Sequence, residues 1–460
     1  MNIKKAVAFI AGPFAFITVS LLELPGLSSE GQAVLASTIW VGIWWMTEAV
    51  ELEVTSLLPI LLLPLSGAMK IGEVTTSYGQ SYIFLFMGGF IIGLAVEKCG
   101  LHKRIAFSII HFIGTGPKKV VLGFMIATGF LSMWISNTAT AIMMLPIALS
   151  LSGEGHDKFS THLLLGIAYA ASIGGMATLI GTPPNIIFAA VMKNSVGVEI
   201  PFVNWMLFAF PFSFILIIAC WWYLTRSFIS NQDISLVIPE KPRQMDIAQK
   251  RVSLIFGLVA LLWIIRSFLL SKLIPGIDDT VIAMFGGLIL FIIPSGKSRE
   301  TLMDWKTAKT LPWGILLMFG GGLAIAKGFS TTDLATWLAG WFRELDFLPV
   351  ILITLTVVAS TNFLTEMTSN TATASMLLPL LITLSASLNM PPVILMSGAV
   401  LASSCAFMLP VATPPNAVVF SSGKIKIQQM IHTGFWLNIV SIVLILLFST
   451  YVGPMLLSIE

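Results

Sequence analysis

Apolar residues run along most of the chain in long stretches that short polar segments separate. Runs of about 20 residues, the length of helix that crosses a bilayer, occur about eleven times. They cover residues 5–25, 31–50, 54–69, 80–98, 161–192, 202–224, 252–274, 279–294, 312–329, 391–422 and 431–458. This pattern predicts an all-α polytopic membrane protein with about eleven transmembrane helices.

Two further apolar blocks, 118–152 and 347–386, are each interrupted in the middle by the string Ser-Asn-Thr. If the N-terminus is cytoplasmic and both blocks are re-entrant hairpins, 19 of the 25 Lys and Arg residues fall in cytoplasmic loops. The other six lie outside: Lys70, Lys193, Arg266, Lys272, Lys327 and Arg343. This asymmetry agrees with the positive-inside rule, and a full crossing by either block would remove it. We therefore expect two re-entrant hairpins and a C-terminus outside.

Composition narrows the class of protein. Of the residues, 56% are hydrophobic and 10% charged, against about 25% charged in an average soluble domain. The net charge of +3 is too small, and its cations too scattered among loops, to indicate a nucleic-acid partner. The basic start and apolar run of the N-terminus lack a small-residue cleavage site, so we expect an uncleaved first helix. The five histidines show no paired spacing that would indicate a transition metal.

Three landmarks recur at nearly one offset along the chain. They are Ser136 and Ser369, 233 apart; Thr182 and Thr413, 231 apart; and Gly88 and Gly320, 232 apart. Five crossings separate the copies, and an odd number predicts that the two halves are inserted upside down relative to each other. Inverted repeats are typical of secondary transporters, which bind substrate near the bilayer midplane on discontinuous helices.

Each half has two sites at which a helix should break. The first is the Ser-Asn-Thr string at 136–138 and 369–371, and the second is Thr-Pro-Pro-Asn at 182–185 and 413–416. Non-helical backbone at membrane depth persists only inside protein or beside a polar cavity. Any single copy could be ordinary helix capping, but two matched pairs favour a binding site. Four helix N-termini would then present unpaired N–H groups to an anion.

Basic side chains are scarce near these breaks. No Lys, Arg or His lies within ten residues of either Ser-Asn-Thr string, and near the Thr-Pro-Pro-Asn strings the only cations are Lys193, Lys424 and Lys426. A helix N-terminus contributes about 0.3 to 2 kcal/mol, whereas desolvating an ionised carboxylate can cost tens of kcal/mol. We therefore expect a cation-poor pocket in which Na⁺, held by hydroxyl, amide and carbonyl oxygens, makes the anion site.

The paired strings, in this order and spacing, resemble the divalent anion/sodium symporter family along both halves of the chain. Its members carry di- and tricarboxylates or sulfate, usually with several Na⁺, as homodimers whose transport domain moves like an elevator against a scaffold. The resemblance implies that the substrate is held by Asn137, Thr138, Thr182, Pro183, Asn370, Thr371, Thr413 and Pro414. It implies that one Na⁺ is held by Ser132, Ser136, Asn137 and Gly181, and a second by Thr365, Thr368, Asn370 and Ala412.

The same resemblance implies a division of the chain. Scaffold would comprise 1–117 and 251–346, transport parts 118–230 and 347–460, and a cytoplasmic linker 231–250. We expect a Na⁺-coupled carrier for C4-dicarboxylates such as succinate, malate and fumarate, with citrate a further candidate, in the lipid of a bacterial cytoplasmic (inner) membrane. A dicarboxylate exchanger, a proton-coupled anion carrier and a sulfate symporter remain alternatives. An enzyme is not expected, because the Ser-Asn-Thr serines have no His, Lys or Asp close by in the sequence.

Glu366 distinguishes the second half from the first, which has Met133 at the matching position. One interpretation is a helix carboxylate turned toward polar neighbours such as Thr361 or Asn362. The alternative is a proton or cation site, because an ionisable residue inside a membrane protein is a functional candidate.

Overall fold

The computed structural model describes residues 3–151, 157–226, 244–297, 300–345 and 347–457, and within them every named element is a helix. The first half contains α1 Ile3–Leu21, α2 Ser29–Thr47, α3 Leu52–Thr55, α4 Leu58–Leu65, α5 Ile71–Thr75, α6 Ser81–Lys98, α7 Leu101–Ile113, α8 Pro117–Ser132, α9 Asn137–Leu151, α10 Asp157–Met176, α11 Pro183–Val191 and α12 Phe202–Thr225. The second contains α13 Ile247–Ile265, α14 Ser271–Leu273, α15 Asp279–Ile292, α16 Trp305–Ala308, α17 Trp313–Thr331, α18 Leu334–Phe342, α19 Val350–Leu364, α20 Asn370–Ser387, α21 Pro392–Ser404, α22 Pro414–Phe420, α23 Ile427–Leu447 and α24 Gly453–Leu457.

The all-α polytopic architecture is confirmed. Six helical stretches of the described residues are at least 18 residues long and apolar enough to cross a membrane. They are Ile71–Lys98, Lys158–Met176, Phe202–Thr225, Ile247–Leu273, Trp313–Thr331 and Ile427–Leu457. Of the other predicted crossings, 31–50 corresponds to α2, which is 19 residues long but is not among these six, and the rest correspond to shorter apolar helices, so the number eleven stays a prediction. In the predicted linker 231–250, residues 231–243 lie outside the described residues, and α13 already begins at Ile247.

All four predicted helix breaks are present. α8 and α9 flank the first Ser-Asn-Thr string, and α19 and α20 flank the second. The Thr-Pro-Pro-Asn strings begin α11 and α22, because proline lacks the N–H that the first turn leaves unpaired and its fixed φ suits a helix start. Four short helices that the structure describes were not predicted: α5 before α6, α7 after α6, α16 before α17 and α18 after α17.

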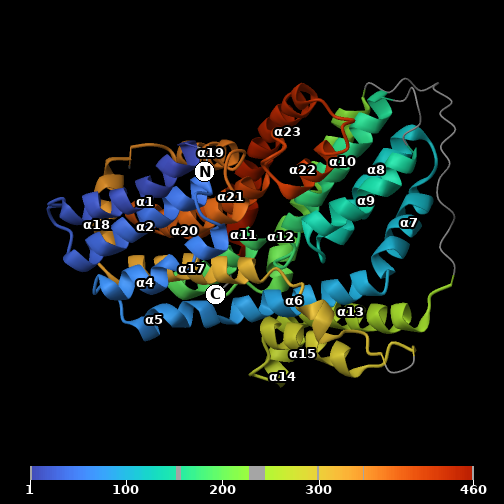
Figure 1. The fold of residues 1–460 in the computed structure, drawn as a ribbon, viewed down its shortest axis with the longest axis horizontal. Coiled ribbons are helices and arrows are strands. Elements are labelled where there is room, and N and C mark those ends of the chain that lie inside the picture. The colour runs from blue at the N-terminus through green and yellow to red at the C-terminus, as the bar shows by residue number, and fades with distance from the viewer. Residues whose placement is uncertain (1–2, 152–156, 227–243, 298–299, 346, 458–460) are drawn as a thin grey trace.

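The two halves interlock rather than lie side by side. α9 packs against α22 of the other half, and α11 packs against α20. In Figure 1, α7 to α10 lie at one end of the molecule, α1, α2, α18 and α20 lie at the other, and α6 runs beneath both with α13 and α15 below it. In both of these pairs, therefore, one helix comes from the first half and the other from the second half.

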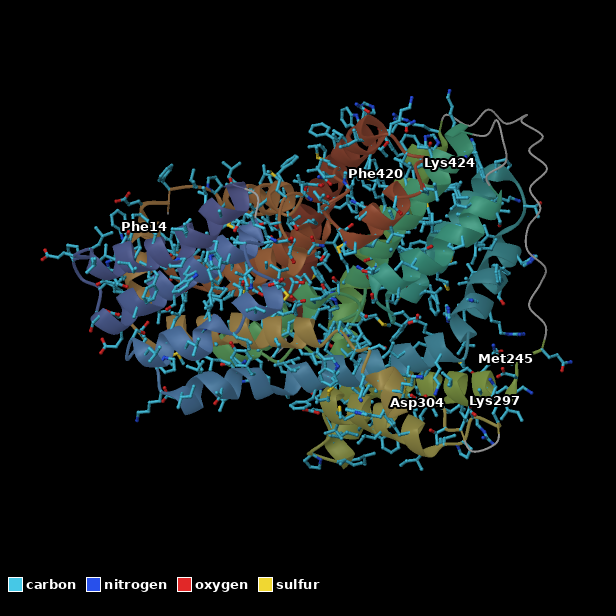
Figure 2. The ribbon with its side chains drawn as sticks, viewed as in Figure 1. Phe14, Met245, Lys297, Asp304, Phe420 and Lys424 are labelled. Atoms are coloured by element: carbon cyan, nitrogen blue, oxygen red, sulfur yellow. The ribbon has the colours of Figure 1, made fainter. Side chains whose placement is uncertain are left out.

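Glycine permits several close contacts between helices. A Cβ on Gly88 of α6 would lie 2.7 Å from the Ala283 backbone of α15, and one on Gly321 of α17 would lie 2.6 Å from the Ser56 carbonyl. Side chains fill the remaining space between the helices (Figure 2), and Asp304 and Lys297 lie on the α13–α15 side, far from Phe14 of α1.

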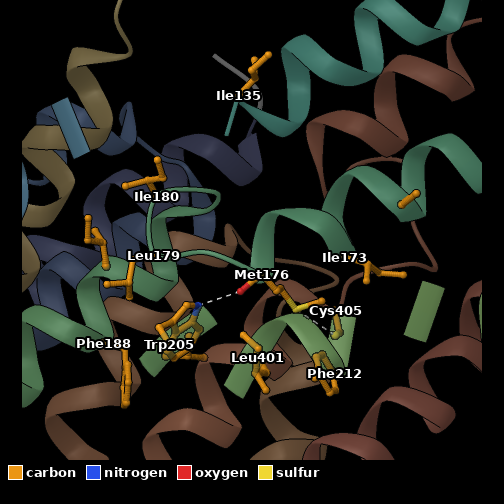
Figure 3. Packing of buried hydrophobic residues seen from close by; sticks show 14 of the residues in the cluster. Ile135, Ile173, Met176, Leu179, Ile180, Phe188, Trp205, Phe212, Leu401 and Cys405 are labelled. Carbon is orange, nitrogen blue, oxygen red and sulfur yellow. Dashed lines mark hydrogen bonds between the residues drawn. The ribbon is translucent and has the colours of Figure 1, made fainter. Parts of the chain in front are cut away.

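The breaks of the two halves meet in the apolar core. Figure 3 shows Met176, the last residue of α10, between Trp205 and Cys405. The Trp205 indole donates to the Met176 carbonyl at 3.0 Å, and Cys405 Sγ lies 3.8 Å from Met176 Sδ. Because Cys405 directly follows α21, the first helix break is held against the second.

Candidate functional site

In the first half, a compact group of oxygens surrounds the start of α9. The buried Ser132 hydroxyl lies 2.6 Å from Asn137 Oδ1 and 2.6 Å from the Ala171 carbonyl. The Asn137 amide lies against Gly175, where a Cβ would come within 2.5 Å of Oδ1. A Cβ on Gly181 would in turn lie 2.4 Å from the Gly175 carbonyl. The structure therefore brings Ser132, Asn137 and Gly181 together around glycine backbone.

The second half repeats both contacts of the buried hydroxyl. The buried Thr365 hydroxyl lies 2.7 Å from Asn370 Oδ1 and 2.7 Å from the Ser403 carbonyl. Each of these three residues follows its first-half counterpart by 232 or 233 positions, the offset of the sequence repeat. A duplicated geometry of this kind, built on a buried hydroxyl, an amide oxygen and a helix-end carbonyl, is a duplicated polar site.

The asparagine that ends each Thr-Pro-Pro-Asn string braces the break. Asn185 Nδ2 donates to the carbonyls of Gly175, Met176 and Thr178 at 3.1, 3.2 and 2.7 Å. Asn416 Nδ2 donates to the Ala406 and Leu409 carbonyls at 3.1 and 3.0 Å. These bonds satisfy carbonyls that the unwound chain would leave unpaired in an apolar core.

Sequence reasoning did not assign this bracing role to Asn185 and Asn416. The signal that could have found it was the repetition of Asn three residues after each Thr. Both asparagines are fully buried, so they hold the loops rather than line an open pocket.

The remaining predicted residues occupy the helix starts. Thr182 and Thr413 are the N-cap residues of α11 and α22 and are both 3% exposed, and only Thr413 accepts a side-chain capping bond, from Asn416 N. Pro183 and Pro414 are the first residues of these helices. The structure thus places all four at helix N-termini.

The residues around the Ser-Asn-Thr strings differ in burial. Thr138 is half-buried and Thr371 is 8% exposed. Ser136 accepts a long bond from Ala139 N at 3.4 Å, and the Thr368 hydroxyl lies 2.7 Å from that of Thr373. Ala412 is buried at the end of the second break, but no contact joins it to Asn370 among the described hydrogen bonds. The first predicted sodium set is therefore gathered more fully than the second.

The donor chemistry fits Na⁺, a hard cation that oxygen ligands bind. Hydroxyl, amide and carbonyl oxygens make up both groups, without a thiol or an imidazole. Several buried oxygens nearby lack a hydrogen-bond partner at matching positions of the two halves, namely Ser172 Oγ and Ser404 Oγ, and Asn185 Oδ1 and Asn416 Oδ1. Buried polar atoms without a partner are costly, and a bound cation or water would satisfy them.

A cavity of about 440 Å³ reaches the first tip from one side. Its walls are Phe90, Gly93, Leu94, Glu97 and Lys98 of α6, Ile135, Ser136 and Ala139 of the first hairpin, and Thr307, Thr310 and Pro312. Ser136 is the only predicted site residue among them.

Lys98 in this wall is a basic side chain that the expected cation-poor pocket did not include. It comes from α6, which sequence proximity could not reveal. Its ammonium lies 2.5 Å from Asp304 Oδ2, and this hydrogen bond holds the pKa of Asp304 at about 2. With Glu97 also in the wall, the cavity has no excess of positive charge.

Comparisons with known proteins agree with this geometry. The family model described as "Sodium:sulfate symporter transmembrane region" matches residues 3–459. The chain belongs to this family.

Curated members of the symporter family resemble the whole chain. It is 42% identical to the "Sodium-dependent dicarboxylate transporter SdcS" of Staphylococcus saprophyticus, over 100% of this chain and 93% of that one. It is 44% identical to the protein of the same name from Staphylococcus aureus strain USA300, over 99% and 92%. Among solved structures, the Alcanivorax borkumensis YdaH transporter superposes with a TM-score of 0.62 at 15% identity, covering 84% of this chain and 88% of that one. This last likeness concerns the fold alone.

Glu366 of this symporter chain ties the second hairpin tip to the second break. Its carboxylate accepts backbone N–H bonds from Phe407, Met408 and Leu409 at 2.7 to 3.1 Å, and a 2.8 Å bond from Asn438 Nδ2. The predicted partners Thr361 and Asn362 are wrong, because the unwound chain offers free N–H groups that a helix does not.

The first half ties the same two elements differently. There the Thr178 hydroxyl donates to the Met133 carbonyl at 2.6 Å. A neutral bond in one half thus corresponds to a buried carboxylate in the other.

Proposed function

We propose that this protein is a secondary active transporter that couples Na⁺ entry to the uptake of C4-dicarboxylates such as succinate, malate and fumarate by alternating access. The relatives named as sodium-dependent dicarboxylate transporters support the substrate class and the coupling ion. The observation that carries the proposal is the duplicated group of hydroxyl, amide and carbonyl oxygens at the starts of α9 and α20.

In this proposal each asparagine serves both ligands. Asn137 and Asn370 contribute Oδ1 to Na⁺ and Nδ2 to a carboxylate, with Thr138 and Thr371 beside them and Thr182, Pro183, Thr413 and Pro414 at the facing helix starts. Ser132, Ser136 and Gly181 complete the first Na⁺ site, and Thr365, Thr368 and Ala412 the second. Four helix N-termini at about 0.3 to 2 kcal/mol each stabilise a dianion too weakly alone, so co-bound Na⁺ supplies the missing positive charge.

The register of the two hairpins supports a sliding motion. A Cβ on Gly93 of α6 would lie 2.8 Å from the Trp134 carbonyl at the first tip. In the second half, a Cβ on Gly322 of α17 would lie 3.0 Å from Ser375, which is eight positions beyond Met367, the counterpart of Trp134. Gly322 itself lies three positions before the counterpart of Gly93. Exchanging the two registers therefore moves the contact eight positions along the second hairpin and three positions along α17. At 1.5 Å per helical residue, this requires a shift of about 15 Å.

The exposure of matching residues also differs between the two halves, and this difference supports the same motion. Ile180, before the first Gly-Thr-Pro-Pro string, is 4% exposed, whereas its counterpart Val411 is 83% exposed. Met367 is 78% exposed, whereas its counterpart Trp134 is half-buried. An inverted repeat caught at one end of its motion would present such an asymmetry, and the other end state would exchange the two patterns.

We propose the division of the chain that the family resemblance implies. The moving part comprises 118–230 and 347–460, and the scaffold comprises 1–117 and 251–346. We further propose a homodimer in the lipid of a bacterial inner membrane, with the N-terminus cytoplasmic and the C-terminus outside. The cavity beside Ser136 and Lys98 then opens to the cytoplasm, so the structure corresponds to an inward-facing state.

Uptake into proteoliposomes tests the function. Labelled succinate should accumulate above equilibrium and saturate under an inward Na⁺ gradient, and replacing Na⁺ with K⁺ should abolish uptake. Malate and fumarate should compete with it. Uptake that neither accumulates nor saturates would indicate a channel and contradict the proposal.

A panel of anions and gradients separates the alternatives. Uptake that requires internal dicarboxylate but no Na⁺ would indicate an exchanger, and uptake driven by a pH gradient alone would indicate proton coupling. Sulfate transported in preference to succinate, citrate and 2-oxoglutarate would indicate a sulfate symporter.

A further inference from the structure

An ionic cluster joins the loop after α11 to the turn between α13 and α15. Arg266 Nη2 lies 2.6 Å from Glu199 Oε1, and Arg266 Nη1 lies 3.4 Å from Asp279 Oδ2. Asp279 Oδ2 also accepts the Phe202 N–H at 2.8 Å. The Arg266 side chain is 10% exposed and the Glu199 side chain 40%, so water reaches the carboxylate of this pair while the guanidinium is largely shielded from it.

Aromatic rings extend this contact from the ionic cluster toward the first hairpin tip. Phe202 stacks on Trp263 with ring centres 4.4 Å apart, and the Trp263 indole donates to the Asp279 carbonyl at 3.0 Å. Trp134, at the first hairpin tip, packs edge-on to Phe256 of α13 at 4.9 Å. In the proposed division, Glu199, Phe202 and Trp134 lie on the moving part and their partners on the scaffold. A slide of about 15 Å, the helical-register estimate given above, must break the Glu199–Arg266 pair.

The elements that correspond to this cluster in the inverted repeat carry charges in the opposite arrangement, with acidic residues on the scaffold and basic residues on the moving part. Counted back from the glycine-rich helices α6 and α17, α2 and α3 of the first half correspond to α13 and α15 of the second. The loop after α22 corresponds in the same way to the loop after α11. The turn between α2 and α3 and the start of α3 carry three exposed acidic residues, Glu48, Glu51 and Glu53. The loop after α22 carries two exposed basic residues, Lys424 and Lys426. None of the ion pairs found among the described residues includes any of these five.

We propose that these charges form two ionic contacts that alternate during transport. Glu199 with Arg266 holds the present state, and Lys424 and Lys426 with the Glu48–Glu53 turn hold the opposite state. The proposal rests on the alternating access proposed above, but it concerns residues that touch neither substrate nor Na⁺. The two contacts set the populations of the end states.

Labelling of a buried reporter cysteine measures those populations. Ile180→Cys, in a Cys99→Ser background, should react with a maleimide only while the protein visits the opposite state, so its rate reports the fraction in that state. In detergent-solubilised protein, Glu199→Gln should raise this rate about two- to fivefold, the effect expected for an ion pair whose carboxylate is partly exposed to water. The double variant Lys424→Gln/Lys426→Gln should lower it.

Two controls separate the contact from charge and folding. Asp278→Asn removes a charge one residue from the cluster but keeps the N-cap bond to Val281, and it should leave the rate unchanged. Val411→Cys, already exposed, should react rapidly in every variant if the fold is intact. Glu199→Lys, which faces Arg266 with a like charge, should exceed Glu199→Gln.

Each outcome has one meaning. Equal Ile180→Cys rates in the parent, Glu199→Gln and Glu199→Lys overturn the outer contact while leaving alternating access intact. An unchanged rate in the double lysine variant overturns the mirrored contact. No labelling of Ile180→Cys in any protein, with Val411→Cys reactive, overturns both the contacts and the proposed motion.

Discussion

Asn137 and Asn370 combine two tasks in one small side chain. Each begins a helix, and each receives a hydroxyl at its Oδ1, from Ser132 and Thr365 respectively. A neutral amide can turn its oxygen to a cation and its N–H groups to an anion, which no charged side chain can do. The sequence predicted both residues because the strings recur, but their hydroxyl partners came only from the family resemblance.

Removing either amide should abolish transport. Asn137→Ala and Asn370→Ala delete a group proposed to touch both ligands, so succinate uptake should fall to background and any residual uptake should require more Na⁺. The measurement is initial uptake against Na⁺ concentration in proteoliposomes. Asn204→Ala is the matched control, because Asn204 bonds only the Leu456 carbonyl among the described contacts. Wild-type uptake by either site variant would be incompatible with the proposed site.

Glu366 is the residue whose surroundings the sequence could not reveal. Its backbone donors belong to a loop that begins 41 residues later, and its side-chain donor Asn438 lies 72 residues later. The loop offers free N–H groups only because α21 stops at Ser404. Glu366→Gln should cost about 2 to 3 kcal/mol of stability, because hydrogen bonds to a buried charge are lost and an amide N–H group faces other donors. Thermal unfolding in detergent checks this.

The pH dependence of the Glu366→Gln variant separates its two interpretations. A bracing carboxylate predicts a lower melting temperature and an unchanged pH profile of the residual uptake. An unaltered melting temperature together with a lost pH dependence would instead identify a proton site and contradict the bracing role.

At the level of elements, the breaks were predictable and the short amphipathic helices were not. Prolines and polar strings on an apolar background mark where a helix must stop, so α9, α11, α20 and α22 begin where the sequence predicted. α7 and α18, with 13 and 9 residues, are too short to stand out as spans. The packing partners of the broken helices also had to come from the structure, because α9 and α22 are separated by most of the chain.

Close packing of α8 against α10 gives a prediction at this scale. A Cβ on Gly174 would lie 2.2 Å from the Gly129 carbonyl, which is backbone and cannot turn aside. Gly174→Ala should therefore separate the helices and destabilise the protein by about 1 to 3 kcal/mol, the usual cost of overpacking. Gly257→Ala in α13 meets nothing within 4 Å and should be neutral or slightly stabilising. Melting temperatures equal for both variants would contradict this contact.

The whole molecule is asymmetric although its sequence is repeated, and the proposed mechanism rests on this asymmetry. The sequence contains the repeat and predicts an odd number of crossings, but in the proposed motion the register of each hairpin depends on which end state the chain occupies. No pattern along the chain encodes that choice, because both registers use the same residues. The exposure of Val411 and the burial of Ile180 reflect the register that this structure has.

Cross-linking can capture both registers. Ser375→Cys with Gly322→Cys should form a disulfide in the present state, since a Cβ at 322 lies 3.0 Å from Ser375 Cβ. Met367→Cys with Ile325→Cys mirrors the contact of Trp134 with Gly93 and should form only in the opposite state. In the present register this second pair is about 15 Å apart along the helices, beyond the span of a disulfide.

Na⁺ and succinate should make the second cross-link accumulate, because cycling carries the tip past Ile325. Each disulfide should stop uptake, since it holds the hairpin at one end of its travel, and a reductant should restore uptake. If the Ser375–Gly322 pair forms and the Met367–Ile325 pair never does, the two registers do not exchange. The repeat would then be a relic of duplication rather than the basis of the motion.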